Sequence, residues 1–301
     1  MDTKVDEGSH LRFHFCRRFR IDRTRADSWV AQPFSVLAMT TRGRLELLIA
    51  GLRECLVKPA PGQVYFLPAG VRRQPHLVGS EAAEVLALGI ALEFLGGLDL
   101  LPRMGIPFLP EPSARLKTQL LSMEEMEQQA GDRSLRWTVT RQALGYALVS
   151  DLLACAAPGA NAPSLVPEEQ RCAPAIRFMD DHCAEPLSLT RLSELCHLSR
   201  THFFRLFKKQ AGCTPFGYLR QLRLREACRM LAGTNLTVAE IGCRVGWPDP
   251  YHFSRTFKAA TGMAPSHYRS YYCGNGRSRS AVTSRRTTTG ERGAAKDSVG
   301  G

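Results

Sequence analysis

Short apolar runs alternate with turn-forming segments over residues 11–92 of the chain. Leu11, Phe13 and Phe15 alternate with polar residues, as they would in a half-buried strand. Further apolar runs lie at residues 34–39, 45–49, 52–57, 64–67 and 85–92. Gly and Pro occur between these runs, where they favour turns. Many short strands separated by such turns predict a β-barrel or a β-sandwich.

The apolar period lengthens to that of a helix over residues 113–155. Leu116, Leu120 and Met123 fall on one stripe, and a second apolar face extends over residues 137–153. We therefore expect two amphipathic helices after the β-rich part. The pattern leaves two alternatives open for them: they pack on the strands of their own chain, or they pair with a second copy of the chain.

A sequence repeat with a spacing of 50 residues follows in the C-terminal part. The segment HFFRLFKKQAGCTPFGY at 202–218 aligns with HFSRTFKAATGMAPSHY at 252–268. Identical Phe, Arg, Lys, Gly, Pro and Tyr residues occupy equivalent positions in the two copies. A match of this density indicates a duplicated structural unit.

Each copy has the pattern of a helix-turn-helix unit. Ser188 and Ser199 are expected to cap the two helices of the first unit, and Thr237 and Asp249 those of the second. A helix over residues 216–231 is expected to hold the two units apart.

The second helix of each unit presents polar side chains to solvent when its Phe side chains are turned inward. In the first unit these outward residues are Arg200, Thr201, Phe204, Arg205 and Lys208, and in the second they are Tyr251, Ser254 and Arg255. Such a helix fits the major groove of DNA, where arginine can bind guanine in a bidentate manner. For Arg205 and Arg255 an alternative stays open, namely an ion pair with a carboxylate of the same chain.

Basic side chains around these helices are expected to contact phosphates, which position a protein on DNA without reading its sequence. The candidates are Lys208, Lys209, Lys258, Arg220 and Arg223. The charge distribution supports this view. Residues 1–171 hold 20 Lys and Arg against 19 Asp and Glu, whereas residues 172–272 hold 14 against 7. A basic domain beside a nearly neutral one indicates that the basic domain binds a polyanion.

The segments 187–231 and 236–269, which contain both units, resemble the AraC/XylS family of bacterial transcription regulators. The resemblance implies two helix-turn-helix subdomains whose recognition helices enter successive major grooves of double-stranded DNA. His197 stands in the first turn, where this family often has glycine, and histidine tolerates the left-handed backbone that the turn requires. The base-facing residues that the resemblance implies are Arg200, Thr201, Phe204 and Arg205 in the first unit and Pro250, Tyr251, Ser254 and Arg255 in the second.

Residues 42–78 are similar to the cupin-like sensor domains that occur in this family. That similarity implies a small-molecule effector inside the barrel, and sugar-responsive relatives make a carbohydrate plausible. No residue of the sequence fixes the ligand, so the effector-binding residues are unknown. His76 is the only histidine in the region, and one imidazole without an adjacent carboxylate does not make a metal site. We expect no metal and no other cofactor.

The predicted fold class is a multidomain chain: a β-rich cupin-like barrel with appended helices, then an all-α tandem helix-turn-helix domain. The expected divisions are 1–112 for the effector-sensing domain, 113–155 for a helical pair that dimerises, 156–174 for a linker, 175–272 for the DNA-binding domain and 273–301 for a disordered basic tail. The ten cysteines are scattered without a CxxC pair, as expected for unpaired thiols in a reducing compartment.

The predicted function is an effector-responsive, sequence-specific transcription regulator. Ser199, Lys208 and Lys258 complete the DNA-contacting set, as a helix cap and two phosphate contacts. The resemblance implies an activator. The expected protein partners are RNA polymerase and, through the helical pair 113–155, a second copy of the chain. No signal peptide or apolar run of membrane-spanning length is visible, which favours the cytoplasm and no membrane partner. We expect no enzymatic activity; the alternative is a cupin-type enzyme fused to a DNA-binding domain.

Overall fold

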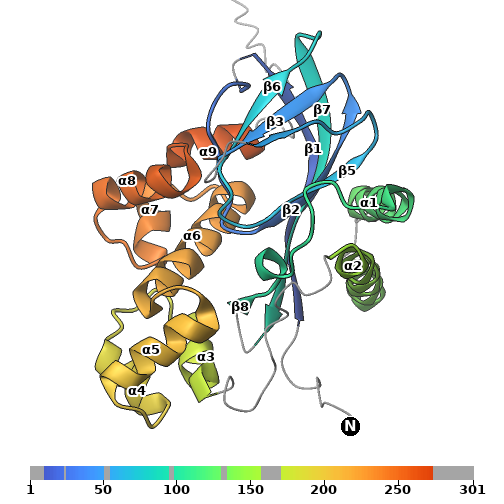
Figure 1. Ribbon diagram of the computed structural model, residues 1–301. Coiled ribbons are helices and arrows are strands. Elements are labelled where there is room, and N and C mark those ends of the chain that lie inside the picture. The colour runs from blue at the N-terminus through green and yellow to red at the C-terminus, as the bar shows by residue number, and fades with distance from the viewer. Residues whose placement is uncertain are drawn as a thin grey trace, which may run out of the picture.

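The computed structural model describes residues 10–23, 25–50, 55–94, 98–129, 134–156 and 171–273. The expected linker and the expected basic tail lie almost entirely outside these residues. A β-rich N-terminal domain is followed by two long helices and then by a helical C-terminal domain (Figure 1). The multidomain fold class predicted from the sequence is confirmed.

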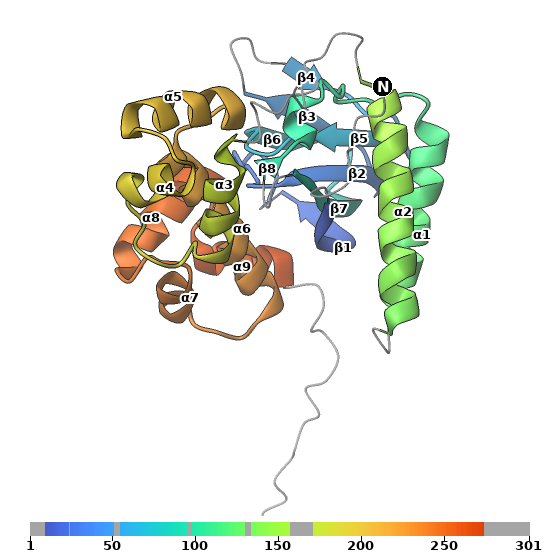
Figure 2. The same cartoon turned by 90° about the horizontal axis from the view of Figure 1, so that it is seen from below.

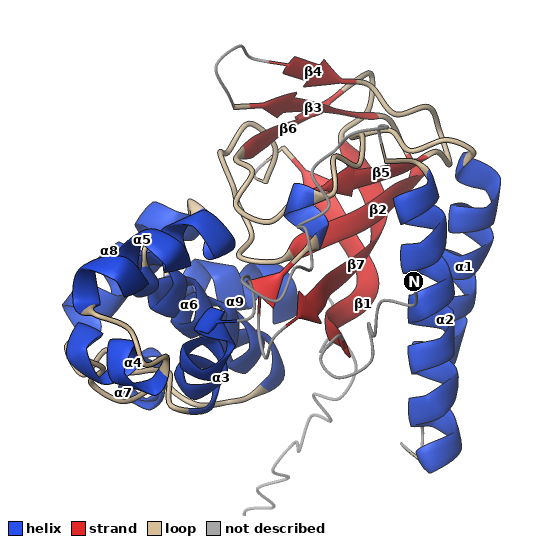
Figure 3. Cartoon of the chain, turned by 60° about the horizontal axis from the view of Figure 1, so that its bottom comes forward, coloured by secondary structure: helices blue, strands red, loops and turns tan. Residues whose placement is uncertain are grey.

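Two β-sheets form the N-terminal domain. The larger sheet has the order β1-β7-β2-β5, with β8 beside β7, and the smaller sheet has the order β4-β3-β6. All paired strands are antiparallel. Figure 3 shows the smaller sheet at one end of the larger one. The strands are β1 His10–Asp22, β2 Ser35–Arg42, β3 Leu45–Ile49, β4 Cys55–Val57, β5 Val64–Leu67, β6 Arg73–Leu77, β7 Ala82–Phe94 and β8 Leu98–Asp99.

Strands β2 and β7 are buried on both faces, which explains their continuous apolar sequences. Val36 and Val85 belong to the cluster between the two sheets, whereas Leu37 and Leu86 belong to a second cluster on the opposite face. Strand β6 was not among the predicted strands. Its sequence, RQPHL, has no apolar run, and only Pro75 in its middle is buried.

Helices α1 (Ser113–Gln128) and α2 (Leu135–Ala154) cover the outer face of the larger sheet, on the side away from the C-terminal domain (Figure 2). The predicted stripe Leu116, Leu120 and Met123 is fully buried in the cluster against the sheet. The inner faces of α1 and α2 thus pack on the strands of their own chain, which confirms one of the two alternatives for these faces. None of the described helices is long and apolar enough to cross a membrane.

The C-terminal domain consists of two short helix pairs on a long central helix. Helices α4 and α5 form the first unit and α7 and α8 form the second, while α6 runs between the two units (Figure 1). The helices are α3 Ala173–Asp181, α4 Leu189–Leu195, α5 Arg200–Ala211, α6 Pro215–Gly233, α7 Val238–Arg244, α8 Pro250–Thr261 and α9 Pro265–Cys273. The predicted duplication and the separating helix are confirmed.

The predicted caps begin these helices as expected. The side chains of Ser188, Ser199 and Thr237 accept hydrogen bonds from the backbone N–H groups three residues beyond the cap. Thr237 and Glu240 form a reciprocal capping box. Asp249 accepts a hydrogen bond from the backbone N–H of Tyr251 at 2.9 Å. These caps satisfy backbone donors that a helix start leaves open, so they fix where each helix begins.

Candidate nucleic-acid interface

Helix α5 is the candidate recognition helix of the first unit. Phe203 and Phe207 are fully buried in the cluster of that unit, which turns the opposite face of α5 outward. The preceding turn contains His197, whose φ of 53° lies in the left-handed region. The expectation that histidine replaces glycine in this backbone conformation is confirmed.

Helix α8 repeats this arrangement in the second unit. Phe253 and Phe257 are fully buried, and Phe253 stacks on Trp247 of the preceding turn. Gly246 takes the positive φ, 85°, that His197 takes in the first unit. In both units the left-handed residue stands second after the first helix, although the second turn is one residue longer than the first.

The sequence-predicted contact residues lie on one outward face of each recognition helix. In the first unit Arg200, Thr201, Arg205 and Lys208 are exposed and Phe204 is half-buried. In the second unit Pro250, Tyr251, Arg255 and Lys258 are exposed and Ser254 is half-buried. Ser199 is exposed, with its hydroxyl accepting a hydrogen bond from the backbone N–H of His202. Tyr251 has 81% of its surface exposed, so its ring and hydroxyl are accessible to a partner.

Arg205 and Arg255 are free of ion pairs within the described part of the chain. Their guanidinium groups are thus available to an external acceptor. The alternative of pairing with a carboxylate of the same chain finds no support among these residues.

Arg223 does not lie where the sequence suggested. It was expected to contact phosphate, but its guanidinium donates hydrogen bonds to the carbonyl oxygens of Cys183, Glu185 and Gly246. Gly246 belongs to the turn of the second unit, whereas Cys183 and Glu185 follow α3 beside the first. Arg223 therefore ties the two units together through α6, and the phosphate-contact prediction for it is wrong. Sequence alone could not find this, because the three acceptors are backbone atoms.

A cluster of charged side chains joins the C-terminal domain to the β-rich domain. Glu93 at the end of β7 is fully buried and accepts hydrogen bonds from Arg225 of α6 at 3.0 Å and from Arg12 of β1 at 2.9 Å. Arg12 also donates to Asp180 of α3 at 3.2 Å. We call these four residues the Glu93 cluster. Beside it, burial raises the pKa of Asp99 to about 7.

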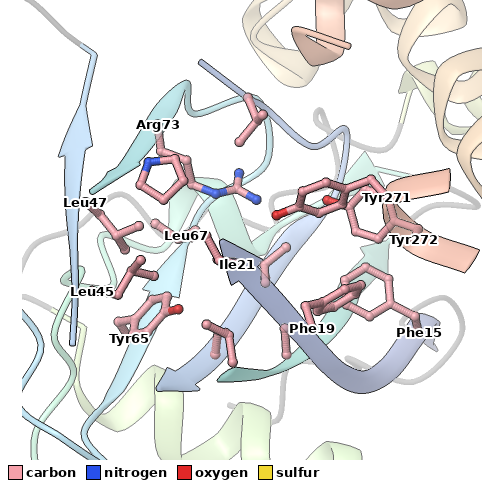
Figure 4. A pocket seen from close by; sticks show the side chains of 16 residues that line it. Phe15, Phe19, Ile21, Leu45, Leu47, Tyr65, Leu67, Arg73, Tyr271 and Tyr272 are labelled. Carbon is pink, nitrogen blue, oxygen red and sulfur yellow. The ribbon is translucent and has the colours of Figure 1, made fainter. Parts of the chain in front are cut away.

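An apolar cavity lies inside the β-rich domain, and α9 of the C-terminal domain closes one side of it (Figure 4). Its volume is about 50 Å³. Both sheets contribute side chains, including Phe19 and Leu47, while Tyr271 and Tyr272 enter from α9. Arg73 is the one cationic residue of this lining. The sequence pattern did not identify the cavity, because Arg73 lies on the unpredicted strand β6 and the tyrosines lie beyond the repeat.

His76 lies on the same strand, but its Nδ1 atom contacts the carboxylate of Asp27. Among the described residues there is no group of three His, Cys, Asp or Glu side chains that could hold a metal ion.

Comparisons with known proteins agree on the C-terminal domain. A family model described as a helix-turn-helix domain matches residues 192–271. The MmsAB operon regulatory protein of Pseudomonas aeruginosa is 38% identical over 92 residues, which cover 31% of this chain and 30% of that protein. The transcriptional activator RhaS of Escherichia coli is 30% identical over 145 residues, which cover 48% of this chain and 51% of that protein.

The matched part of the chain therefore spans about a third to a half of the length of these relatives. A further relative, AdaA of Bacillus subtilis, is named a bifunctional transcriptional activator and DNA repair enzyme; it is 35% identical over 92 residues, covering 31% of this chain and 44% of that protein. The relatives are thus transcription regulators, one of them with an additional enzymatic activity.

The whole architecture also has a counterpart among solved structures. ToxT from Vibrio cholerae O395 superposes with a TM-score of 0.58 over 88% of this chain and 98% of that chain, at 12% sequence identity. The two proteins share the fold: a β-rich N-terminal domain followed by a helical domain with two helix-turn-helix units.

Proposed function

We propose that this chain, whose C-terminal domain is of the AraC type, is a transcription regulator that binds double-stranded DNA through α5 and α8. The observation that carries the proposal is the pair of exposed and unpaired arginines, Arg205 and Arg255, at equivalent positions of the two recognition helices. Guanidinium groups on an outward helix face suit guanine edges in the major groove. The exposed Lys208 and Lys258 lie one turn further along and suit phosphates.

The proposal extends to the full set of DNA contacts named from the sequence. They are Ser199, Arg200, Thr201, Phe204, Arg205 and Lys208 in the first unit and Pro250, Tyr251, Ser254, Arg255 and Lys258 in the second. Within this set the first unit offers more side chains able to hydrogen-bond to bases, since proline offers none. We therefore assign more of the sequence discrimination to α5.

The remaining parts of the proposal concern the other domains. The β-rich domain, residues 1–112, binds a small-molecule effector, and the chain acts in the cytoplasm as an activator together with RNA polymerase. It has no catalytic role of its own. The names of the relatives support this reading, because RhaS is called a transcriptional activator and a Staphylococcus xylosus relative a lactose operon transcription activator.

DNA binding is tested with the full chain and a duplex that this chain selects from a random library. We expect Arg205→Ala to weaken binding by about 1–3 kcal/mol and to relax the preference at one base position. Arg44→Ala is the matched control, since it removes the same charge from an exposed site in the β-rich domain. Equal losses on selected and on random DNA would contradict base recognition by Arg205.

Dimerisation is assigned to the outer faces of α1 and α2, within the proposed helical pair 113–155. On α2, Leu135 is 80% exposed, Val139 59% and Tyr146 43%, and these residues recur at helical spacing. We expect Val139→Glu to shift the full chain from dimer to monomer in sedimentation, because it places a charge in the apolar contact. Thr140→Glu adds the same charge to the next exposed position. A monomeric native chain would remove the dimer from the proposal.

A further inference from the structure

The cavity in the β-rich domain contains a charge that the described chain does not neutralise. Arg73 pairs with Val30 through its backbone, while its guanidinium extends into the cavity toward Tyr271 (Figure 4). No carboxylate among the described residues forms an ion pair with it. Arg73 is half-buried, so its charge is partly withdrawn from water without a counter-charge, and the site favours an anionic ligand.

The rest of the lining favours an aromatic body on that anion. Phe15, Phe19 and Tyr65 face the cavity from the strands, and two phenol rings already occupy it from α9. A sugar would need several hydrogen-bonding side chains around it, and the lining has no Asn, Gln, Asp or Glu. The chemistry therefore departs from the carbohydrate suggested by the sequence resemblance.

The cavity is too small for such a ligand unless a side chain moves. Its 50 Å³ compare with about 300–1,000 Å³ for typical ligand pockets. The strand residues of its wall are held by two hydrogen-bonded sheets. Tyr272 is held as well, because Gln32 donates a hydrogen bond to its hydroxyl.

Tyr271 is the side chain that can leave. It is half-buried, it belongs to the last turn of the last described helix, and its hydroxyl has no hydrogen-bond partner among the described residues. Its ring stacks beside Phe19 at a centroid distance of 6.2 Å and beneath the Arg25 guanidinium at 4.5 Å. An aromatic ligand could take over the contact with Phe19 that Tyr271 makes.

The geometry points to a binding site for a small aromatic carboxylate, in which Arg73 pairs with the carboxylate and the ligand ring replaces Tyr271. This inference rests on the proposed function only in treating the β-rich domain as the effector site. Displacement of Tyr271 reaches the second unit through α9, because Tyr272 packs on Tyr268 at 4.3 Å and Tyr268 packs on Phe257 of α8 at 5.2 Å.

The experiment measures binding of benzoate, phenylacetate and 4-hydroxybenzoate to the full chain by calorimetry, with benzamide as the neutral analogue. We expect at least one carboxylate to bind and the amide to bind at least tenfold more weakly. Arg73→Gln should weaken carboxylate binding by about 10- to 100-fold, the range for a hydrogen bond to a charged group. Arg72→Gln is the matched control, since Arg72 is exposed and stacks on Trp29 outside the lining.

A second variant tests the displaced side chain. Tyr271→Ala should bind the carboxylate more tightly than the native chain, because no ring has to leave, whereas Tyr271→Phe should bind with nearly native affinity. Circular dichroism confirms that each variant is folded. Failure of all three carboxylates to bind, equal binding of the amide, or equal losses for Arg72→Gln and Arg73→Gln would overturn the inference.

The same preparations are tested for binding to the selected DNA. Retained DNA binding without carboxylate binding would overturn this inference and leave the proposed function in place. If the native chain did not bind DNA with sequence specificity, the proposed function would be contradicted, irrespective of the carboxylate-binding result.

Discussion

The two helix-turn-helix units are alike internally but are attached to the β-rich domain by different forces. The second unit shares a hydrophobic cluster with the interior of that domain: Phe253, Phe257 and Tyr268 belong to the same cluster as Phe19 and Val85. The first unit has its own cluster, which receives only strand-end residues such as Leu98 from the β-rich domain. Its other connections are polar: the Glu93 cluster, which reaches the first unit through α3 and α6, and Arg103, which donates a hydrogen bond to the carbonyl oxygen of Gln210 at the end of α5.

The backbone contacts show the same difference. At the end of α8 the carbonyl of Thr261 accepts a hydrogen bond from the backbone N–H of Ala31 at 2.9 Å. At the end of α5 the carbonyl of Gln210 is instead contacted by the flexible side chain of Arg103. An apolar attachment is insensitive to salt and pH, whereas a polar one depends on both. The cavity of the β-rich domain thus shares its hydrophobic cluster with the second unit, whereas the first unit is attached through strand-end residues and polar contacts.

The largest effect is expected from breaking the Glu93 cluster. Arg225→Met should lower the free energy of unfolding by about 3–5 kcal/mol, because Glu93 stays buried after losing a partner. Arg229→Met is the control on the same helix: its ion pair with Glu226 is at the surface and is worth at most about 1 kcal/mol. Urea unfolding of the full chain measures both. Similar losses in the two variants would show that the Glu93 cluster does not fasten the first unit.

A smaller effect on stability is expected from alanine substitutions at two equivalent glycines, one in each unit. Gly212 and Gly262 end α5 and α8 with φ values of 67° and 82°, so alanine costs each about 1 kcal/mol in backbone strain. At Gly262 a Cβ atom would also lie 2.0 Å from the carbonyl oxygen of Trp29, whereas at Gly212 it would meet only the movable end of Arg103.

We therefore expect Gly262→Ala to cost about 2–4 kcal/mol in total and Gly212→Ala about 1 kcal/mol. Parallel urea unfolding measures the difference between the two variants. If Gly212→Ala were as costly as Gly262→Ala, the first unit would be attached as rigidly as the second.

Much of this architecture could be predicted from the sequence, because the signals that specify it are local. The caps at Ser188, Ser199, Thr237 and Asp249 act within three residues of their position, and the 50-residue repeat shows the duplication directly. The buried stripe of α1 follows from helical periodicity. For the same reason the outward residues of α5 and α8 could be assigned to one face before their surroundings were known.

The features that escaped prediction all depend on contacts between distant segments. Arg223 binds three carbonyl oxygens that no sequence pattern marks, and Glu93 and Arg225 are 132 positions apart. Arg73 and Tyr271 meet only because α9 docks on the β-rich domain. Sequence periodicity shows which face of an element is buried but not which partner buries it, so the residues that line the cavity and the interface between domains could not be predicted.

A third effect, on the pH dependence of stability, tests whether the attachment of the first unit responds to pH. Asp99 lies beside the Glu93 cluster; burial raises its pKa to about 7, although it accepts hydrogen bonds from the backbone N–H groups of Leu92 and Leu101. The folded chain therefore holds a proton on Asp99 that the unfolded chain releases near pH 4. The contribution of Asp99 to the free energy of unfolding is therefore fully present below about pH 4 and is lost as the pH rises through about 7.

Between about pH 5 and pH 7 the native chain should lose about 2 kcal/mol of stability from Asp99. Asp99→Asn should remove this part of the pH dependence, because an amide keeps the oxygen that accepts both N–H groups and carries no charge. Asp181→Asn is the control, since Asp181 is exposed on α3. The urea midpoints of the three proteins are measured at both pH values. Subtracting the native change from the change in each variant removes the contribution of the other titrating groups. Parallel pH profiles for native and Asp99→Asn proteins would mean that the first unit, like the second, is held by contacts that do not titrate.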